Sequence, residues 1–342
     1  MLSGLSRTVA CSLQRPAFRC MSTTIESHKN FMCISQLSND ELEGLLQHSL
    51  DMKAAWYGDA PSARKVKPLD GQTMSMIFQK RSTRTRVSTE TGMFMLGGHG
   101  LMLGPSDIQL GVNESMKDTS NVLCRFNDII LARVFGHEDV VELAKYSDVP
   151  VINALSDKYH PLQTLADLMT LREHFGLEKG SLRGKTLGWV GDGNNIIHDL
   201  MIGAIKQGMN VKVATPVGYE CDADVVATAE QLAKDNGVTL TFTTDPIVAS
   251  TDSHAIVTDT WVSMGEESQK EKKIKEFDGY QVNDDMMSRA DSNAVFLHCL
   301  PRKPEEVTDS VFYSDKSLVF PEAENRLWTV MAVTMELLGK RW

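Results

Sequence analysis

Short apolar runs alternate with longer segments of helical periodicity through the first half of the chain. The runs have the composition and flanking turn residues of buried strands, and the segments between them repeat apolar residues at helical spacing. Strands that alternate with helices in this way predict βαβ units and a parallel sheet. The predicted strands are 73–78, 101–103, 128–132 and 149–154, and the predicted helices are 39–57 (capped by Ser38 and Glu41 and ended by Gly58), 87–96, 114–126 and 140–146.

A long helix and a polar, glycine-containing segment divide the chain near its middle. Pro161 is well placed in the first turn of a helix that extends to about Phe175, and 176–184 is polar. The pattern then restarts with strands at 186–190, 211–214, 239–243, 255–258 and 294–298 and helices at 196–207 and 223–236. We therefore expect an α/β fold of two doubly wound domains with parallel central sheets, joined by this interdomain helix.

Two further segments stand outside that alternation. The charged segment 266–276 is typical of a solvated helix or a mobile loop. The tail, 321–342, reads as a long helix with one apolar face. We expect this C-terminal helix to pack back on the first domain.

The first 21 residues differ in composition from the rest of the chain. They contain Arg7, Arg15 and Arg19, several serines, and no acidic residue. An arginine- and serine-rich N-terminus without acidic residues is typical of a mitochondrial transit peptide. We therefore expect 1–21 to direct the protein to the mitochondrial matrix, with a frayed N-terminus as the alternative.

Composition narrows the class of protein further. The chain of 342 residues is 42% hydrophobic and has a formal net charge of −10 at pH 7. An acidic chain argues against nucleic-acid binding, which needs a basic face. The six cysteines form no C-x-x-C pair, so we expect neither a zinc cage nor a disulfide framework. No apolar stretch reaches the ~18 residues needed to cross a bilayer, so a membrane is not an expected partner either.

A basic segment rich in Ser and Thr follows the first strong strand. It reads Gln79-Lys80-Arg81-Ser82-Thr83-Arg84-Thr85-Arg86 and opens a helix. Backbone N–H groups at a helix start attract phosphate, hydroxyl groups add donors, and arginine adds charged bidentate donors. Basic residues this close together would repel one another without an anion. The segment predicts a phosphate site, and a capped surface helix is the alternative.

The last two strands of the first half are also followed by polar side chains. Arg133 directly follows one strand, and 156–163 follows the other and opens the long helix. His160 stands at the cap position of that helix, and Gln163 lies one turn away on the same side. An imidazole and an amide together suit a small planar group with a carbonyl and an NH2. A structural arginine and a capping histidine are the simpler alternatives.

Loops of the second half also follow strands, where ligands of such folds bind. The loop 191–195 has two glycines, but Ile196 replaces the third glycine of a dinucleotide fingerprint, so Asn194 and Asn195 look more like a polar substrate clamp. In the loop 259–265, the Asp259 carboxylate could hold an amine, and Ser263 with the peptide beyond it could hold a carboxylate. The alternative for Asp259 is that it caps the next turn.

Two further candidates lie near the end of the chain. His298-Cys299-Leu300-Pro301-Arg302 follows an apolar strand and offers a cysteine, the obvious nucleophile. No Cys–His relay can be established from the sequence, however, and a cysteine at a strand end is most often inert packing. Arg326 lies near the start of the last helix, where an exposed salt bridge is its simplest role.

Taken together, these segments closely resemble the aspartate/ornithine carbamoyltransferase family over about residues 30–338. The resemblance rests on Ser82-Thr83-Arg84-Thr85-Arg86, His160-Pro161-Leu162-Gln163, Asp259-Thr260-Trp261-Val262-Ser263-Met264-Gly265 and His298-Cys299-Leu300-Pro301. The Ser-Met-Gly loop favours the mitochondrial ornithine branch over the aspartate branch. The chain departs from that pattern mainly in its longer linker at 176–184.

The resemblance implies a homotrimer of two-domain subunits without cofactor or metal. Carbamoyl phosphate would bind 30–160, ornithine would bind 176–320, and 321–342 would return to the first domain. The implied carbamoyl phosphate contacts are Ser82, Thr83, Arg84, Thr85, Arg133, His160, Gln163, Cys299, Leu300, Arg326 and, from a neighbouring subunit, Gln109. The implied ornithine contacts are Asn195, Asp259, Ser263 and Met264.

The implied reaction is direct attack of the ornithine side-chain amine on the carbamoyl carbon, with Cys299, Arg133, His160 and Asp259 at the reacting centre. An alkyl amine titrates near pH ~10.4, so we expect the rate to rise with pH. Because the amine attacks the carbamoyl carbon directly, we expect no acyl-enzyme. Three rivals stay open from the sequence: a carbamoyltransferase with another amine acceptor, a nicotinamide-dependent oxidoreductase built on Gly191-Asp192-Gly193, and a silent binding protein.

Overall fold

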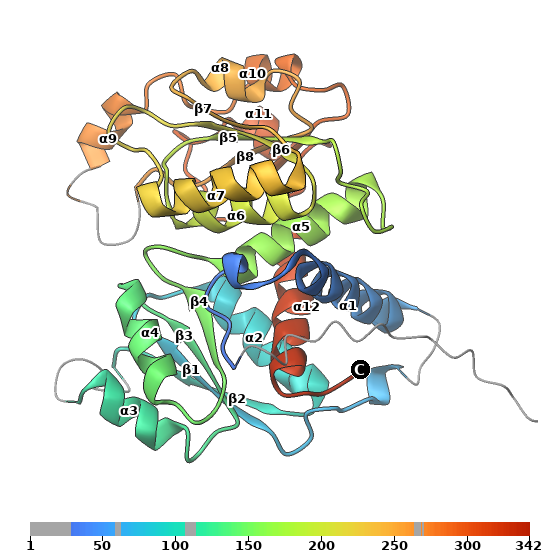
Figure 1. Ribbon diagram of the computed structural model, residues 1–342, viewed down its shortest axis with the longest axis vertical. Helices are drawn as coiled ribbons and strands as arrows, with labels where there is room; N and C mark the ends of the chain where they lie inside the picture. The colour runs from blue at the N-terminus through green and yellow to red at the C-terminus, as the bar shows by residue number, and fades with distance from the viewer. Residues whose placement is uncertain (1–28, 59–62, 107–113, 263–267, 269) are drawn as a thin grey trace, which may run out of the picture.

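The computed structural model describes residues 29–58, 63–106, 114–262, 268 and 270–342, so the predicted transit peptide 1–21, Gln109, Ser263 and Met264 lie outside the described residues. Figure 1 shows two separate sheets, one above the other, each covered by helices. All strand pairs in both sheets are parallel. The predicted class, two parallel α/β domains, is confirmed.

The first domain holds a sheet of strand order β2-β1-β3-β4. Its central strands are almost wholly buried, as expected of apolar runs covered on both faces. The chain runs from β1 to β2 on one side and then to β3 on the other. The strands are β1 (Thr73–Phe78), β2 (His99–Leu103), β3 (Ile129–Arg133) and β4 (Val151–Leu155), and the helices are α2 (Thr83–Leu96), α3 (Met116–Leu123) and α4 (His137–Tyr146).

The second domain holds a sheet of strand order β7-β6-β5-β8-β9. The chain first adds strands on one side of β5 and then crosses to the other side, so the strand order reverses beside β5. Such reversals in parallel sheets leave a crevice at the carboxyl ends of the strands, and both sheets have one. The strands are β5 (Thr186–Val190), β6 (Asn210–Ala214), β7 (Leu240–Thr243), β8 (Ala255–Thr258) and β9 (Val295–His298), and the helices are α6 (Asn195–Lys206), α7 (Ala223–Asn236), α8 (Pro246–Ser250), α9 (Lys270–Glu276), α10 (Asp284–Arg289) and α11 (Asp309–Phe312).

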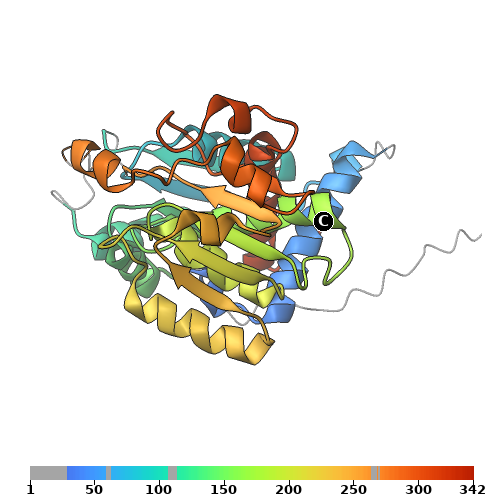
Figure 2. The same ribbon diagram turned by 90° about the horizontal axis from the view of Figure 1, so that it is seen from above.

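Three long helices join the domains: α1 (Asn39–Tyr57), α5 (Pro161–Phe175) and α12 (Val319–Leu337). Helix α12 packs against α5, α2 and α1, and α5 also packs against α6 of the second domain. The C-terminal helix therefore returns to the first domain as predicted, and Figures 1 and 2 show it beside α1. Two short 3-10 turns, η2 (Ile34–Gln36) and η3 (Ala63–Lys65), flank α1.

The bounds of several elements match the predictions, and others are corrected by local capping. Strands β1 and β5 and helices α5 and α7 begin and end where predicted. Helix α2 begins four residues earlier, at Thr83, because Ser82 accepts a hydrogen bond from a backbone N–H in its first turn. Helix α3 begins later than predicted, at Met116, because Ser115 caps it, and it ends earlier, at Leu123. Helix α12 ends at Leu337, shortly before Gly339 turns into the left-handed region at φ 62°.

The glycine pair after β5 has a structural explanation. A Cβ atom on Gly193 would lie 2.5 Å from the backbone nitrogen of Cys221, so the close approach of two chain segments requires glycine there. This packing accounts for the glycine without a bound dinucleotide. Among the helices of the described residues, none combines the length and the apolar composition that a membrane span requires.

Candidate active site

The loops that follow strands of both sheets meet around one cleft with a volume of about 630 Å³. They meet there because the carboxyl ends of the strands in both domains border the same space. The first domain contributes Lys80, Arg81, Ser82, Thr83, Arg84, Thr85, Arg133, Leu155 and His160, the second contributes Asn195, Ile196, Asp259, Thr260, Val262, Lys270, Cys299, Leu300, Pro301 and Lys303, and α12 contributes Arg326.

The start of helix α2 forms part of the first-domain wall. The Oγ of Ser82 accepts a hydrogen bond from the backbone N–H of Thr85 at 3.2 Å, which fixes the first turn. Arg84 donates from Nη2 to the carbonyl of Leu300, joining this wall to the loop after β9. A helix N-terminus with hydroxyl groups and arginine beside it is suited to a phosphate group. The geometry that the predicted phosphate site requires is therefore present.

Two buried arginines and a buried histidine lie deeper in the cleft. Burial, followed by repulsion from Arg326, lowers the pKa of Arg133 to about 10. Burial, followed by repulsion from Arg84, lowers the pKa of Arg326 to about 10 as well, so both guanidinium groups stay charged at neutral pH. Burial and the three arginine charges lower the pKa of His160 well below its ordinary value, so its imidazole is neutral.

These groups have hydrogen-bonding capacity to spare. The Nε atoms of Arg133 and Arg326 and the Nδ1 of His160 are buried and have no hydrogen-bond partner among the described residues. Buried polar atoms are nearly always paired, so the arrangement suits a small ligand with acceptor oxygens. The simpler roles considered for these residues are wrong: Arg326 is 3% exposed and so makes no exposed salt bridge, and His160 makes no side-chain capping bond.

A buried acidic network lies behind Arg326. Gln163 accepts from Nη1 of Arg326 at 2.7 Å and donates from Nε2 to Asp167 and to Glu322, each at 2.7 Å. Glu322 also accepts from the backbone N–H of His298 at 2.9 Å. Burial raises the pKa of Asp167 to about 7, and burial followed by the Asp167 charge raises the pKa of Glu322 well above its ordinary value. Gln163 therefore supports the cleft from behind rather than lining it.

Asp259, at the end of β8, forms the centre of the opposite wall. One carboxylate oxygen accepts from the Sγ of Cys299 at 2.8 Å, and the other accepts from Nδ2 of Asn194 at 3.0 Å. Both oxygens are thus bonded to side chains of neighbouring loops. Burial and the neighbouring carboxylate raise the pKa of Cys299 well above its ordinary value. The thiol is therefore protonated and is not a preformed nucleophile.

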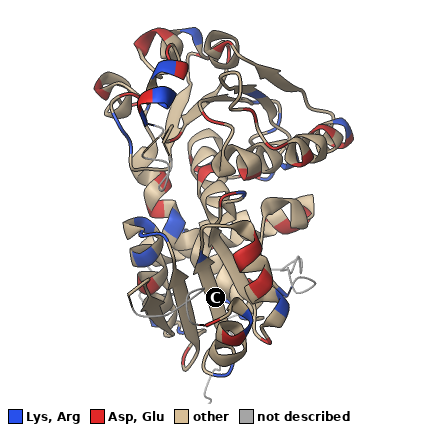
Figure 3. Ribbon diagram, turned by 90° about the vertical axis from the view of Figure 1, so that its left-hand side faces the viewer, with Lys and Arg blue, Asp and Glu red and all other residues tan. Residues whose placement is uncertain are grey.

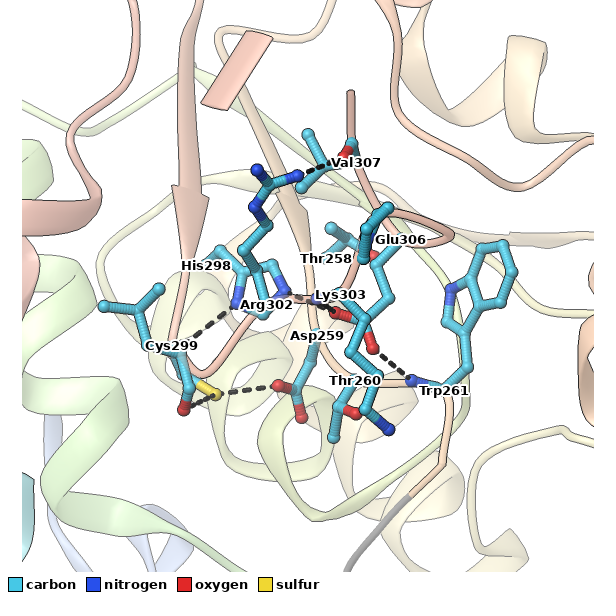
Figure 4. Close-up of polar contacts among 12 residues, drawn as sticks. Thr258, Asp259, Thr260, Trp261, His298, Cys299, Arg302, Lys303, Glu306 and Val307 are labelled. Carbon is cyan, nitrogen blue, oxygen red and sulfur yellow. Dashed lines mark hydrogen bonds and ion pairs between the residues drawn. The ribbon is translucent and has the colours of Figure 1, made fainter. Parts of the chain in front are cut away.

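Figure 4 shows how the loops after β8 and β9 are tied together. Nδ1 of His298 accepts from the backbone N–H of Leu300 at 2.9 Å, so Nε2 carries the proton and donates to Glu306 at 3.2 Å. Glu306 in turn accepts from the backbone N–H of Trp261 at 3.3 Å. His298 therefore positions its own loop and forms no relay with Cys299.

One cluster in this wall has the residue types of a metal site. Ligand atoms of Asp259, His298 and Cys299 lie within 4.8 Å of one another. Both ring nitrogens of His298 are already hydrogen-bonded, and the thiol is bonded to the carboxylate. The contacts within the protein thus account for this cluster.

Asn195 begins helix α6 and lines the cleft, but its Nδ2 donates to the carbonyl of Ser156 at 2.6 Å. In the structure, Asn195, which was predicted to hold a substrate, therefore holds a loop of the first domain. Gln109, Ser263 and Met264 lie outside the described residues, so their predicted contacts stay predictions.

Sequence reasoning missed four charged groups of the site. Lys270 and Lys303 add positive charge to the cleft, and α9, which begins at Lys270, carries both basic and acidic positions, coloured blue and red in Figure 3. Asp167 and Glu322 form the network behind it. The available signal was helical spacing: Asp167 lies four residues after Gln163, and Glu322 lies four residues before Arg326.

Two family models match consecutive parts of the chain. The model described as the carbamoyl-P binding domain of aspartate/ornithine carbamoyltransferase matches residues 29–173, and the model of its Asp/Orn binding domain matches residues 183–337. The chain belongs to the aspartate/ornithine carbamoyltransferase family. The family predicted from the motifs is confirmed. Residues 174–182, which neither family model matches, are the end of α5 and the polar linker.

Relatives within this family match over most of the chain. The mitochondrial ornithine transcarbamylase of Gallus gallus is 48% identical over 310 residues, which cover 91% of this chain and 86% of that protein. The solved ornithine carbamoyltransferase from Pyrococcus furiosus is 44% identical with a TM-score of 0.85, covering 91% of this chain and 97% of that one. The mitochondrial enzyme from Coccidioides immitis is 45% identical with a TM-score of 0.81, covering 89% and 95%. The mitochondrial names of these relatives agree with the mitochondrial part of the predicted location.

Proposed function

We propose that this protein transfers the carbamoyl group of carbamoyl phosphate to the side-chain amine of L-ornithine, giving L-citrulline and phosphate. The observation that carries the proposal is the cluster of buried, unpartnered donors of Arg133, Arg326 and His160 on one side of the cleft. It faces the Asp259 carboxylate on the other side. An anion with a polar carbonyl group would satisfy the first side, and an amine would satisfy the second.

The first-domain wall would hold carbamoyl phosphate. Its phosphate would lie at the start of α2, on the backbone N–H groups and hydroxyl groups of Ser82, Thr83 and Thr85, with Arg84 beside them. The carbamoyl oxygen would accept from Arg133, His160 and Thr85. Arg326, Cys299 and Leu300 would enclose the carbamoyl end, and Gln163 would act by fixing Arg326, with which it shares a hydrogen bond.

The second-domain wall would hold ornithine. The carboxylate of Asp259 would orient the side-chain amine, beside the protonated thiol of Cys299. Asn195, Ser263 and Met264 would contact the amino-acid end of the substrate. In this arrangement the amine would approach the carbamoyl carbon from the second-domain side of the cleft.

The chemistry then needs positioning and charge stabilisation rather than a covalent enzyme intermediate. The neutral amine nitrogen forms a C–N bond to the carbamoyl carbon and gives a tetrahedral intermediate, whose oxyanion Arg133 and His160 stabilise. The bond between that carbon and the phosphate oxygen breaks, phosphate departs with the electron pair, and the nitrogen releases its extra proton. Neutral His160 still carries one ring proton, with which it can donate a hydrogen bond to the oxyanion.

Two finer properties complete the proposal. The enzyme would work as a homotrimer in the mitochondrial matrix, with Gln109 of one subunit reaching the phosphate site of the next. Large apolar side chains are exposed around α2, β2 and the turn after α3, as an intersubunit surface would require. They are Val87, Phe94, Leu101 and Phe126. Light scattering coupled to gel filtration tests the trimer, because a monomer mass at micromolar concentration would contradict it.

The deciding experiment measures the carbamoylated product formed from carbamoyl phosphate with three acceptors: ornithine, putrescine and aspartate. We expect citrulline from ornithine and little product from the other two. A higher kcat/KM with putrescine or aspartate would overturn the choice of acceptor, and the absence of transfer to all three would overturn the carbamoyl transfer itself.

A further inference from the structure

Helix α6 of the second domain contacts the backbone of the loop that ends at His160. Asn195 donates from Nδ2 to the carbonyl of Ser156 at 2.6 Å, and Nδ1 of His198 lies 2.9 Å from the carbonyl of Lys158. Residues three and four positions apart share one face of a helix, so positions 195, 198 and 199 all face the same way. This face of α6 meets the loop at alternate residues.

The third residue of that face bonds to another segment of the first domain. Asp199 is fully buried, and its Oδ1 accepts from the backbone N–H of Ile34 at 2.8 Å. The hydrogen bond from Ile34 favours its charged form and opposes the effect of burial on its pKa, and its Oδ2 has no hydrogen-bond partner among the described residues. Helix α6 thus reaches the backbone of the loop at 156 and 158, although the loop belongs to the first domain.

The tautomer of His198 follows from its two partners. The backbone N–H of Asp222 donates to Nε2 at 3.0 Å, so Nε2 is an acceptor and the ring proton must lie on Nδ1. Nδ1 therefore donates to the Lys158 carbonyl. Burial lowers the pKa of His198, so the neutral ring with this tautomer persists at neutral pH. Each nitrogen has one partner of fixed polarity.

The first domain holds the same loop by other groups. Nδ1 of His137 lies 2.9 Å from the Oγ of Ser156, and its backbone N–H donates to Oδ1 of Asp157 at 2.8 Å. The ammonium group of Lys158 pairs with Asp224, whose side chain is 68% exposed, and exposed ion pairs of this kind contribute little. Among the contacts of the described residues, the buried partner of the Lys158 carbonyl is therefore His198. Lys158 lies two residues before His160 in the loop.

We propose that His198 is a positioning residue, which fixes the Lys158 carbonyl and through it the place of His160 at the carbamoyl group. By this contact the domain proposed to hold ornithine sets the geometry of a group proposed to act on carbamoyl phosphate. The inference rests on the proposed transfer reaction for its kinetic consequence, but the contact itself is tested separately below.

Two nearly isosteric substitutions separate the two bonds of this ring. In His198→Asn the amide nitrogen can occupy the place of Nδ1 and donate to the Lys158 carbonyl, while the bond to Asp222 is lost. In His198→Gln the amide oxygen can occupy the place of Nε2 and accept from Asp222, while the bond to Lys158 is lost. Both variants remove the ring, so loss of packing alone predicts similar effects. Asp224→Asn serves as a surface control.

The first readout is kinetic. We expect kcat of His198→Gln to fall by roughly tenfold to a hundredfold, the scale of a misplaced reacting group, with little change in the KM for ornithine. His198→Asn should retain most of the wild-type kcat, and Asp224→Asn should match the wild type. Equal losses in the Asn and Gln variants would mean that His198 serves only packing, and would overturn the inference.

The second readout does not depend on turnover. Amide hydrogen exchange of the peptide covering 156–160 should be several-fold faster in His198→Gln than in His198→Asn, because one buried hydrogen bond to the loop is lost. If the Gln variant does not fold, His198→Ala replaces it, because alanine keeps neither bond. A wild-type protein without transfer activity would overturn the proposed function alone, whereas equal exchange in both variants would overturn the positioning role.

Discussion

The first-domain wall of the cleft gathers positive charges and leaves buried nitrogen atoms unpaired, whereas the Asp259 carboxylate of the second-domain wall is already hydrogen-bonded at both oxygens. Arg133 and Arg326 repel each other and keep buried donors unpaired. Asp259, by contrast, already accepts from Cys299 and Asn194. An anion entering the first wall relieves an existing repulsion, while an amine entering the second must exchange one hydrogen bond for another. The first wall can therefore bind an anion without losing a hydrogen bond, whereas the second wall must give one up to bind an amine.

This difference also separates stability from activity. Bringing like charges together in a buried site raises the free energy of the folded state, and strained or unpaired groups of this kind cluster at functional sites. The second wall shows the opposite balance, because its carboxylate, thiol and amide stabilise one another. Substitutions in the first wall should damage activity more than stability.

Replacing Arg133 by alanine gives the largest expected effect. The variant loses a donor to the proposed oxyanion, which should cost about 3 kcal/mol of transition-state stabilisation, a fall in kcat of ~100-fold or more. Thermal unfolding should not occur at a lower temperature, because repulsion with Arg326 is relieved. Steady-state kinetics measures the change in kcat, and calorimetry measures the unfolding temperature. Arg289→Ala serves as a control for loss of an exposed positive charge. A kcat near that of the wild type would remove Arg133 from the reacting centre.

Replacing Asp259 by asparagine tests the opposite wall. The variant keeps the shape of the side chain and removes the charge that would orient the amine. The kcat/KM for ornithine should therefore fall roughly 30-fold, which corresponds to about 2 kcal/mol. The affinity for carbamoyl phosphate, measured by calorimetric titration in the absence of ornithine, should change less than twofold. Equal damage to both substrates would show that Asp259 is structural, and Asp285→Asn controls for the loss of an exposed carboxylate.

Asp199→Asn tests a buried acid where the two domains meet. Burial raises the pKa of Asp199 to about 8, so the folded protein holds a proton that the unfolded chain releases near its ordinary pKa. The stability of the wild type therefore falls as pH rises toward 8 and is constant above it. The neighbouring Cys33 and Tyr159 also have raised pKa values and stay protonated over that range.

The asparagine variant has no such proton. Its free energy of unfolding relative to the wild type should increase by about 1.4 kcal/mol per pH unit between pH 6 and 8. Denaturant titrations of both proteins in the same buffers measure the difference, in which all other titrating groups cancel. A difference that does not vary with pH would mean that Asp199 is charged in the folded protein.

The sequence predicted the fold well because strong periodicity and strand-end loops are local signals. Strand β1 and helix α5 have the predicted bounds. The start of helix α2 was missed because one hydrogen bond from Thr85 to Ser82 decides it, and polar residues there hide the helical pattern. The Ser82 and Arg133 loops could be assigned to one edge of the first sheet because parallel strands end at the same edge, whereas only the family resemblance placed the Asp259 loop of the second sheet across the same cleft.

What the sequence could not predict are contacts between distant segments. Gln163 and Glu322 are 159 positions apart, and their hydrogen bond depends on how α12 returns against α5. The same holds for His198, whose position on α6 gives no sign that it faces a loop of the other domain. Helical spacing brings such residues to one face of a helix, but tertiary packing alone determines what that face meets.

The smallest expected effect is that of Cys299→Ser. Since the thiol is protonated and donates to Asp259, a hydroxyl group can take its place, and kcat should fall less than about tenfold. Cys299→Ala removes the donor and should lose more activity than the serine variant. Rapid-quench measurement with carbamoyl phosphate alone should show no burst of phosphate, because no carbamoyl group passes through the sulfur. A burst that disappears in Cys299→Ser would reverse the comparison of the two walls, because the second wall would then supply a nucleophile rather than hold the amine.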